Sequence, residues 1–386
     1  MHRLQHLLSR GAWDHDAARD RLAAWAGGEL VDEEGVLIVD ETGDEKSSTD
    51  CVGAARQYSG ALGGVGLGQV AVHLTYATRH GHALIDRELY QPADWADDEE
   101  RCLLAHVPDE TVFATKPQLA AAMLARARAR ALGIRARWFA GDEIYGSLEL
   151  RRTARFLGFD YALAVKADHR ATTPAGTFTA PQLAAKVPKK AWMRMRTGHG
   201  TKGDRHYDWA MIDLVPDDAP DGSEPAAAGH SFLVVRRHRY TRQLSFYRCH
   251  STTPTTLTRL VDIICTRWKI EEDFQEAKTV AGLDQGQVTT WTSWMRWSLI
   301  SLLAAAVLTI THARTRTRTR TDHDTALELV PASPRELLAV LRASAIPAPR
   351  RDRDHVLAWS AWRRHHQHRA TACHRRWNNI TAAANT

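Results

Sequence analysis

Short apolar runs that end at an acidic residue are the clearest feature of the hydrophobic pattern. Residues 36–39, Val-Leu-Ile-Val, form a continuous apolar run that ends at Asp40. Such a run is typical of a buried central strand. Residues 137–140 lead in the same way through Gly141 to Asp142. The pattern therefore predicts two central strands that each present a carboxylate at their C-terminal end.

The periodicity around these two strands alternates between strand and helix. The other elements expected here are β-rich segments at 54–59 and 69–75, helices at 119–132 and 148–157, and a strand at 161–165. Their order is βββαβαβ, which indicates an α/β core with a mixed sheet flanked by helices.

The periodicity and composition of the sequence change several times outside this core. We expect a helical N-terminal segment (1–33), the first part of the core (34–190), a β-rich insertion (191–250), the second part of the core (251–312), an Arg-Thr linker (313–335) and a basic helical C-terminal tail (336–386). The apolar stretch 299–310 is too short to cross a bilayer, so we interpret it as a buried helix. No membrane partner is therefore expected.

Charge and cysteine usage narrow the class of protein. The formal net charge is +6, and residues 342–376 carry nine arginines against two acidic residues. Such a tail favours a polyanion such as nucleic acid, although a solvated face explains the charge equally well. The five cysteines are scattered and show no metal-binding spacing. Residues 1–16 do not form a signal peptide, so we expect a cytoplasmic, nucleoid-associated protein.

Three carboxylates are candidates for metal chemistry. Asp40 and Asp142 end two central strands, and Glu271 lies on a helix expected at 257–278. Three oxygen ligands select hard cations, so we expect two Mg²⁺ or Mn²⁺ ions. Two such ions support in-line phosphoryl displacement. Glu272 is the alternative ligand on the same helix.

The register of that helix favours Glu271 over Glu272. Positions 267, 271 and 278 are offset by four and seven residues, so Arg267, Glu271 and Lys278 share one helix face. A carboxylate between two cations suits a metal ligand whose substrate is a phosphate chain.

These residues carry a resemblance to a known family. Arg267, Glu271 and Lys278 match three of the four positions of the signature Y-x2-R-x3-E-x6-K, and Ile264 stands in place of the tyrosine. The blocks Val-Asp40-Glu-Thr-Gly and Gly-Asp142-Glu-Ile-Tyr-Gly, together with residues 52–60 and 277–285, also fit. From about residue 7 to 375 the chain resembles DDE-type insertion-sequence transposases, the DDE superfamily endonucleases with an RNase H-like core.

The resemblance implies roles for individual residues. Asp40, Asp142 and Glu271 would be the catalytic, metal-binding triad. Arg267 and Lys278 would contact phosphates of the transposon end. The β-rich insertion would lie across the DNA end. The other expected DNA contacts are Arg56 and Tyr58 near the core, and Lys202, Trp209 and Trp192 in the insertion.

The resulting expectation is a DNA transposase that nicks transposon ends and joins the freed 3′-hydroxyl to target DNA. Double-stranded DNA would be the partner, and two ends handled together imply a homodimer on DNA. Relatives carry a longer helical N-terminal domain, so residues 1–33 are expected to be a shortened end-binding region. Two alternatives remain: a decayed or domesticated transposase that only binds DNA, and another RNase H-like nuclease acting on branched or hybrid substrates.

Overall fold

The computed structural model describes residues 2–60, 63–129, 132–200, 203–219, 229–321, 332–345 and 352–384. The chain divides into two compact units, residues 1–334 and residues 335–386. The first unit contains the sheets and most helices, and each unit is described by itself.

Within the described residues, ten strands form one mixed sheet and two strands form a small separate one. The strands of the large sheet are β1 (Gly35–Glu45), β2 (Ala55–Ser59), β3 (Gly64–Ala77), β4 (His82–Tyr90), β5 (Ala136–Gly141), β6 (Asp160–Val165), β9 (Met193–Gly200), β10 (Gly203–Leu214), β11 (His230–Arg237) and β12 (Leu244–Ser251). The small sheet consists of β7 (Arg170–Thr173) and β8 (Gly176–Thr179).

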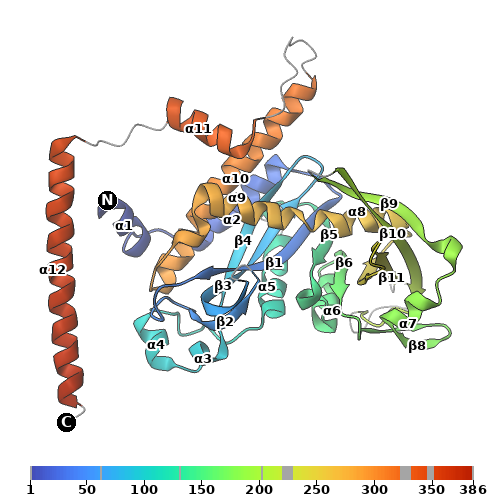
Figure 1. The fold of residues 1–386 in the computed structure, drawn as a ribbon, viewed down its shortest axis with the longest axis horizontal. Coiled ribbons are helices and arrows are strands. Elements are labelled where there is room, and N and C mark those ends of the chain that lie inside the picture. The colour runs from blue at the N-terminus through green and yellow to red at the C-terminus, as the bar shows by residue number, and fades with distance from the viewer. Residues whose placement is uncertain are drawn as a thin grey trace. The chain divides into compact units, whose positions relative to one another are not determined.

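Helices precede, cover and follow these strands (Figure 1). The helices of the first unit are α1 (His2–Ser9), α2 (His15–Glu29), α3 (Ala93–Ala96), α4 (Glu99–Leu104), α5 (Lys116–Arg128), α6 (Leu148–Phe156), α7 (Ala180–Ala185), α8 (Leu257–Thr266), α9 (Lys269–Ala281) and α10 (Trp291–Thr321). Short 3₁₀ turns are η2 (Glu143–Tyr145), η3 (Lys189–Ala191) and η5 (Leu283–Gln285).

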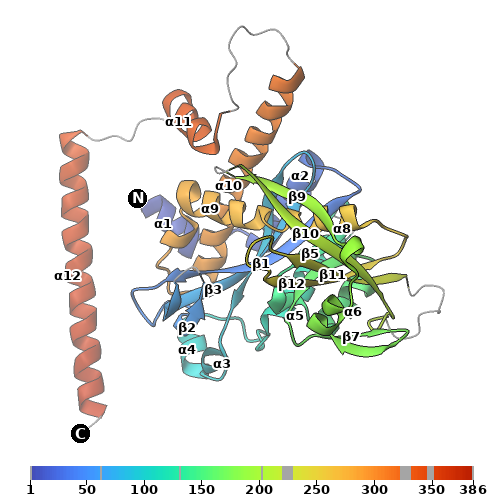
Figure 2. The same ribbon diagram turned by 45° about the vertical axis from the view of Figure 1, so that its right-hand side comes forward.

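The core of the large sheet has the strand order β4-β3-β1-β5-β6. Strand β1 pairs antiparallel with β3 but parallel with β5, and β5 pairs parallel with β6. This is the arrangement of an RNase H-like core, which confirms the α/β class and the mixed sheet. Helices α9 and α10 pack against β3 and β4 on one side, and α5 and α6 lie on the other (Figures 1 and 2).

The predicted central strand is the most deeply buried part of this core. Residues 37–39 have no exposed surface, because the sheet is covered on both faces. Strand β1 continues beyond the apolar run to Glu45 and pairs there with β3. Gly43 is required in this extension because a Cβ there would lie 2.3 Å from the hydroxyl of Ser59 on β2.

The strands expected as an insertion do not form a sheet of their own. Strand β12 pairs antiparallel with β6, and β11, β10 and β9 follow in turn. The core sheet therefore continues into this β-rich region (Figure 2). Strands β7 and β8 and helix α7 follow β6 and precede this region.

Two helical segments differ from the prediction. The helix expected at 257–278 is two helices, because i to i−3 hydrogen bonds donated by the backbone N–H groups of Trp268, Ile270 and Glu271 interrupt the i to i−4 pattern between α8 and α9. The Arg-Thr tract that starts at Arg314 continues α10 as helix as far as Thr321.

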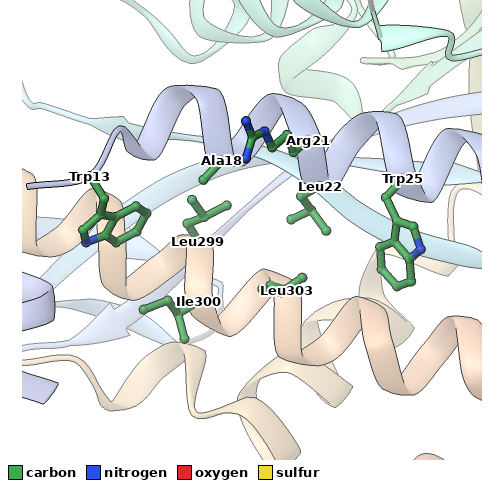
Figure 3. A pocket seen from close by; sticks show the side chains of 8 residues that line it. All are labelled: Trp13, Ala18, Arg21, Leu22, Trp25, Leu299, Ile300 and Leu303. Carbon is green, nitrogen blue, oxygen red and sulfur yellow. The ribbon is translucent and has the colours of Figure 1, made fainter.

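Helix α10 contains the apolar stretch that was interpreted as buried. By composition its portion Trp291–Thr315 could cross a membrane, but 67% of that window is buried inside the protein. One face remains open: Ile300 and Leu303 are 39% and 45% exposed. They line a 260 Å³ apolar groove against α2, with Trp13 and Trp25 at its two ends (Figure 3).

The second unit contains α12 (Arg353–Ala384) and all of α11 (Pro334–Ser344) except its first residue. The described side chains of α12 from Arg353 to Leu357 and from Arg363 to Arg369 are exposed. Stacked rings of Trp359, Trp362 and His366 follow one another along it.

Candidate active site

The pairing of β1 with β5 brings the first two carboxylates together. In this parallel pair Val39 lies opposite Gly141. The next residue of each strand is acidic, so Asp40 and Asp142 emerge side by side at the carboxyl edge of the sheet. Two residues 102 positions apart in the chain thus become neighbours through strand register alone.

A tight turn fixes Asp142 after β5. Its Oδ1 accepts a hydrogen bond from the backbone N–H of Ile144 at 2.9 Å, which caps the 3₁₀ turn η2. Gly146 ends the turn against the carbonyl oxygen of Ala164, where a Cβ would come within 2.5 Å. The turn also buries Tyr145, whose hydroxyl donates to Glu41 Oε2 at 2.6 Å.

The junction between α8 and α9 brings the third carboxylate to the same edge. Arg267 follows the last residue of α8, and its Nη1 donates to Asp40 Oδ2 at 2.6 Å. The same nitrogen lies 3.8 Å from Glu271 Oε1. Arg267 therefore bridges the acidic residues of the strand and the helix.

Helix α9 is held on the sheet by a different acidic residue. Asp273 is buried and accepts hydrogen bonds from Thr75 Oγ1 at 2.8 Å and from His82 Nδ1 at 2.9 Å. Glu272 pairs instead with Lys269 at 2.7 Å and lies 3.4 Å from His82 Nε2. Glu271, not Glu272, is thereby left facing the carboxyl edge.

These side chains surround one cavity of 640 Å³. Its acidic lining consists of Asp40, Glu41, Asp142 and Glu271, and its basic lining consists of Lys116, Arg267 and Lys278. The remaining lining residues are Thr42, Tyr58, Ser59, Gly60, Val70, Ile144, Phe274 and Gln275. All five residues of the predicted triad and its flanking cations therefore share one site.

The acidic residues of this site are insufficiently neutralised by the protein. Burial raises the pKa of Asp40 to about 7; Arg267 opposes this, whereas Asp142, Glu41 and Glu271 raise the pKa further. Burial also raises the pKa of Asp142, against the hydrogen bond from the Ile144 N–H. These raised pKa values show that the charged forms of the carboxylates are poorly stabilised, so the site favours the binding of an added cation.

The residues offer the ligand atoms that a hard divalent cation prefers, but they are not arranged around a preformed metal site. All candidate ligands are carboxylate oxygens on one cavity. Among the described residues, however, no three acidic, histidine or cysteine side chains converge tightly enough to hold an ion as they stand. The guanidinium of Arg267 is the cation that pairs with Asp40 in this structure.

The other expected DNA contacts lie in different places. Tyr58 lines the cavity and is 70% exposed, and Arg56 is exposed on the same strand, β2, but does not line the cavity. Lys202 lies outside the described residues. Trp209 is fully buried against Tyr247, so the DNA contact expected of it is wrong in this structure. Trp192 lines a separate cavity of 570 Å³ beside Arg237.

Sequence reasoning missed three residues of the site. Glu41 and Lys116 line the cavity, and Tyr145 supports Glu41 from beneath. Burial raises the pKa of Tyr145 well above its usual value of 10, so its hydroxyl stays a donor. Glu41 and Tyr145 stood inside the recognised blocks, but only the fold brings Lys116 to them.

Comparisons with known proteins identify the family of the chain. A family model described as DDE superfamily endonuclease matches residues 1–202, and one described as Transposase DDE domain matches residues 104–307. No curated protein matches the chain. A cryo-EM structure of the piggyBac transposase synaptic complex with hairpin DNA matches at a TM-score of 0.41 and 9% identity. The match covers 83% of this chain and 59% of that one.

Each family model spans more than half of the chain, and together they contain the strands and the helix that carry Asp40, Asp142 and Glu271. The chain therefore belongs to the DDE superfamily endonucleases and is a DDE-type transposase.

Proposed function

We propose that this transposase nicks DNA at transposon ends and joins the freed 3′-hydroxyl to target DNA, using two Mg²⁺ or Mn²⁺ ions held by Asp40, Asp142 and Glu271. One observation carries the proposal: the three carboxylates share a single cavity with cations that can bind phosphate. When bound, the ions would activate the attacking oxygen and stabilise the leaving oxygen of an in-line displacement.

Arg267 and Lys278 would hold the scissile strand. Lys278 Nζ donates to the carbonyl oxygen of Gly43 at 3.0 Å, which supports its amine at the cavity wall. Arg267 donates to Asp40, and a backbone phosphate would replace this carboxylate as its partner. That exchange frees Asp40 to serve as a ligand at the moment the substrate arrives.

The partner in this proposal is double-stranded DNA, as transposon end and as target, in the cytoplasm with the nucleoid. Two ends must be processed together, so we propose a homodimer assembled on DNA. The exposed arginines of α12, among them Arg363, Arg364 and Arg369, would add sequence-independent contacts to phosphate.

The test is cleavage of a supercoiled plasmid that carries the ends of the element, with Mn²⁺, by the wild type and by Asp142→Ala. We expect nicked and strand-transfer products from the wild type only. Equal products from both proteins would reject the catalytic assignment. DNA binding without cleavage by either protein would identify a decayed, DNA-binding protein instead. Cleavage of branched or hybrid substrates without strand transfer would identify a different nuclease.

A further inference from the structure

The cations of the cavity are each attached to strand β1. Arg267 bonds to Asp40, Lys116 Nζ donates to Glu41 Oε1 at 2.8 Å, and Lys278 donates to the Gly43 carbonyl. Successive side chains of a strand point to opposite faces. Asp40 therefore directs its cation on the α9 side of the sheet, and Glu41 directs Lys116 on the α5 side, so basic groups flank the cavity from both sides.

The position of Lys116 in its helix is not explained by helix stability. It is the first residue of α5, behind the capping box formed by Thr115 and Gln118. A cation in the first turn opposes the helix macrodipole, which favours negative charge there. Since the cap and Pro117 fix the backbone, the side chain has a defined origin. Its Nζ bonds to Glu41 and lies 5.6 Å from the centroid of the Tyr90 ring.

Glu41 is held so that it serves Lys116 rather than competing for a metal. One oxygen accepts from Lys116 and the other accepts from the fully buried Tyr145. Both oxygens are therefore occupied by donors from the protein. Lys116 itself remains reachable: its side chain is 20% exposed, close to the 24% of Arg267 and the 22% of Lys278.

We propose that Lys116 contacts a backbone phosphate of the DNA in the cavity, opposite Arg267 and Lys278, and that Glu41 and Tyr145 are positioning residues for its amine. The proposal rests on the proposed function in that DNA occupies this cavity. It adds a third phosphate contact, from the sheet face that the family signature does not reach.

The experiment measures binding without catalysis. A fluorescein-labelled DNA duplex is titrated with full-length protein in EDTA, over roughly 50 to 200 mM KCl. The variants are Lys116→Gln, Lys116→Arg and Glu41→Gln. The matched control is Arg79→Gln, which removes the same charge from a side chain 77% exposed. Arg79 lies just beyond the end of β3, at the edge of the sheet opposite the cavity.

Removal of one phosphate contact lowers the slope of log affinity against log salt by about 0.9. We expect this decrease for Lys116→Gln, with wild-type slopes for Lys116→Arg and Arg79→Gln. Glu41→Gln keeps the charge of Lys116, so its affinity falls while its slope stays. Unchanged slope for Lys116→Gln, or the same decrease for Arg79→Gln, would overturn the proposal.

A second measurement uses only the wild-type protein, so it tests the proposal even if a variant does not fold. Acetylation of Lys116 in the wild-type protein by acetic anhydride is followed by mass spectrometry with and without the duplex. Protection by DNA supports the contact, and an unchanged acetylation rate overturns it. Neither assay depends on cleavage, so failure of the catalytic proposal and failure of this one give different results.

Discussion

Asp40, on β1, and Asp218, beyond the end of β10, are both buried carboxylates, but their surroundings differ. Asp40 accepts from one guanidinium, that of Arg267, at 2.6 Å. Asp218 lies beyond the end of β10 and accepts from Arg151 at 2.8 Å, from Arg155 at 2.6 Å and from the hydroxyl of Tyr161. Burial is the largest influence on the pKa of each, and it raises both. Yet the pKa of Asp40 is about 7, and that of Asp218 is about 2.

The difference separates a structural acidic group from a functional one. Around Asp218 the protein supplies enough donors to stabilise the charge, so nothing further needs to bind there. Around Asp40 the neighbouring carboxylates Asp142 and Glu271 add negative charge that one arginine does not neutralise. The site therefore remains open to cations from solution, which a structural network would exclude.

Glu271→Gln should give the largest effect, on activity alone. Loss of one of the three active-site carboxylates should reduce plasmid nicking by roughly 10³-fold or more. The side chain of Glu271 is 40% exposed, so the urea midpoint should stay near that of the wild type. The control is Glu272→Gln, which alters the adjacent residue paired with Lys269 and should keep most of the activity. Inactive Glu272→Gln beside active Glu271→Gln would reverse the assignment.

Asp218→Asn should give the largest effect on stability. The change removes the Asp218 carboxylate from Arg151 and Arg155, whose side chains are 4% exposed; of its described carboxylate partners, Arg151 keeps only the half-exposed Asp217, at 3.1 Å. Breaking a buried pair in this way costs about 3–5 kcal/mol of unfolding free energy. Urea denaturation checks this, with the exposed Asp213 changed to Asn as the control. A cost below that of the control would mean that compensation does not distinguish the two groups.

The sequence could predict those features of the fold that depend on a local hydrophobic or helical pattern. The apolar run 36–39 identified β1 and hence Asp40, and helical register separated Glu271 from Glu272. Strand β4 was missed because its hydrophobic pattern is interrupted by Asp86 and Arg87, both buried. Their partners, Arg126 and Ser298, come from distant helices. Buried charges of this kind resemble exposed positions until the fold supplies their partners.

The site was predictable to the same extent and for the same reason. The spacing of Arg267, Glu271 and Lys278 predicted the site residues that lie on or beside α9. The pair of Glu41 with Lys116 joins residues 75 positions apart, and no local pattern connects them. Trp209 was misassigned because both faces of β10 are covered at that point: its neighbours Asp208 and Ala210 are also buried. Periodicity therefore gives no indication of which side is exposed.

The buried Asp273 has one histidine partner, His82, so it lies between Asp40 and Asp218 in this comparison. The pH dependence of stability should show the contribution of this pair. Burial lowers the pKa of His82, but Asp273 and Glu272 outweigh this and raise it from 6.5 to about 9. A raised histidine pKa adds stability that is complete below pH 6.5 and is lost as pH rises through about 9. We expect the unfolding free energy to fall by about 3 kcal/mol over this window. In His82→Asn the fall should be absent; parallel profiles would contradict the assignment.

Asp208→Asn should give the smallest effect, although Asp208 has three arginine partners. Arg237, Arg194 and Arg242 lie 3.2, 3.4 and 3.8 Å from its carboxylate. Their side chains are 26%, 57% and 66% exposed, so water can solvate them once the carboxylate is gone. We therefore expect a loss of at most about 1 kcal/mol by urea denaturation. A loss as large as that of Asp218→Asn would show that the number of partners, rather than their burial, decides how firmly an acidic residue is built into this sheet.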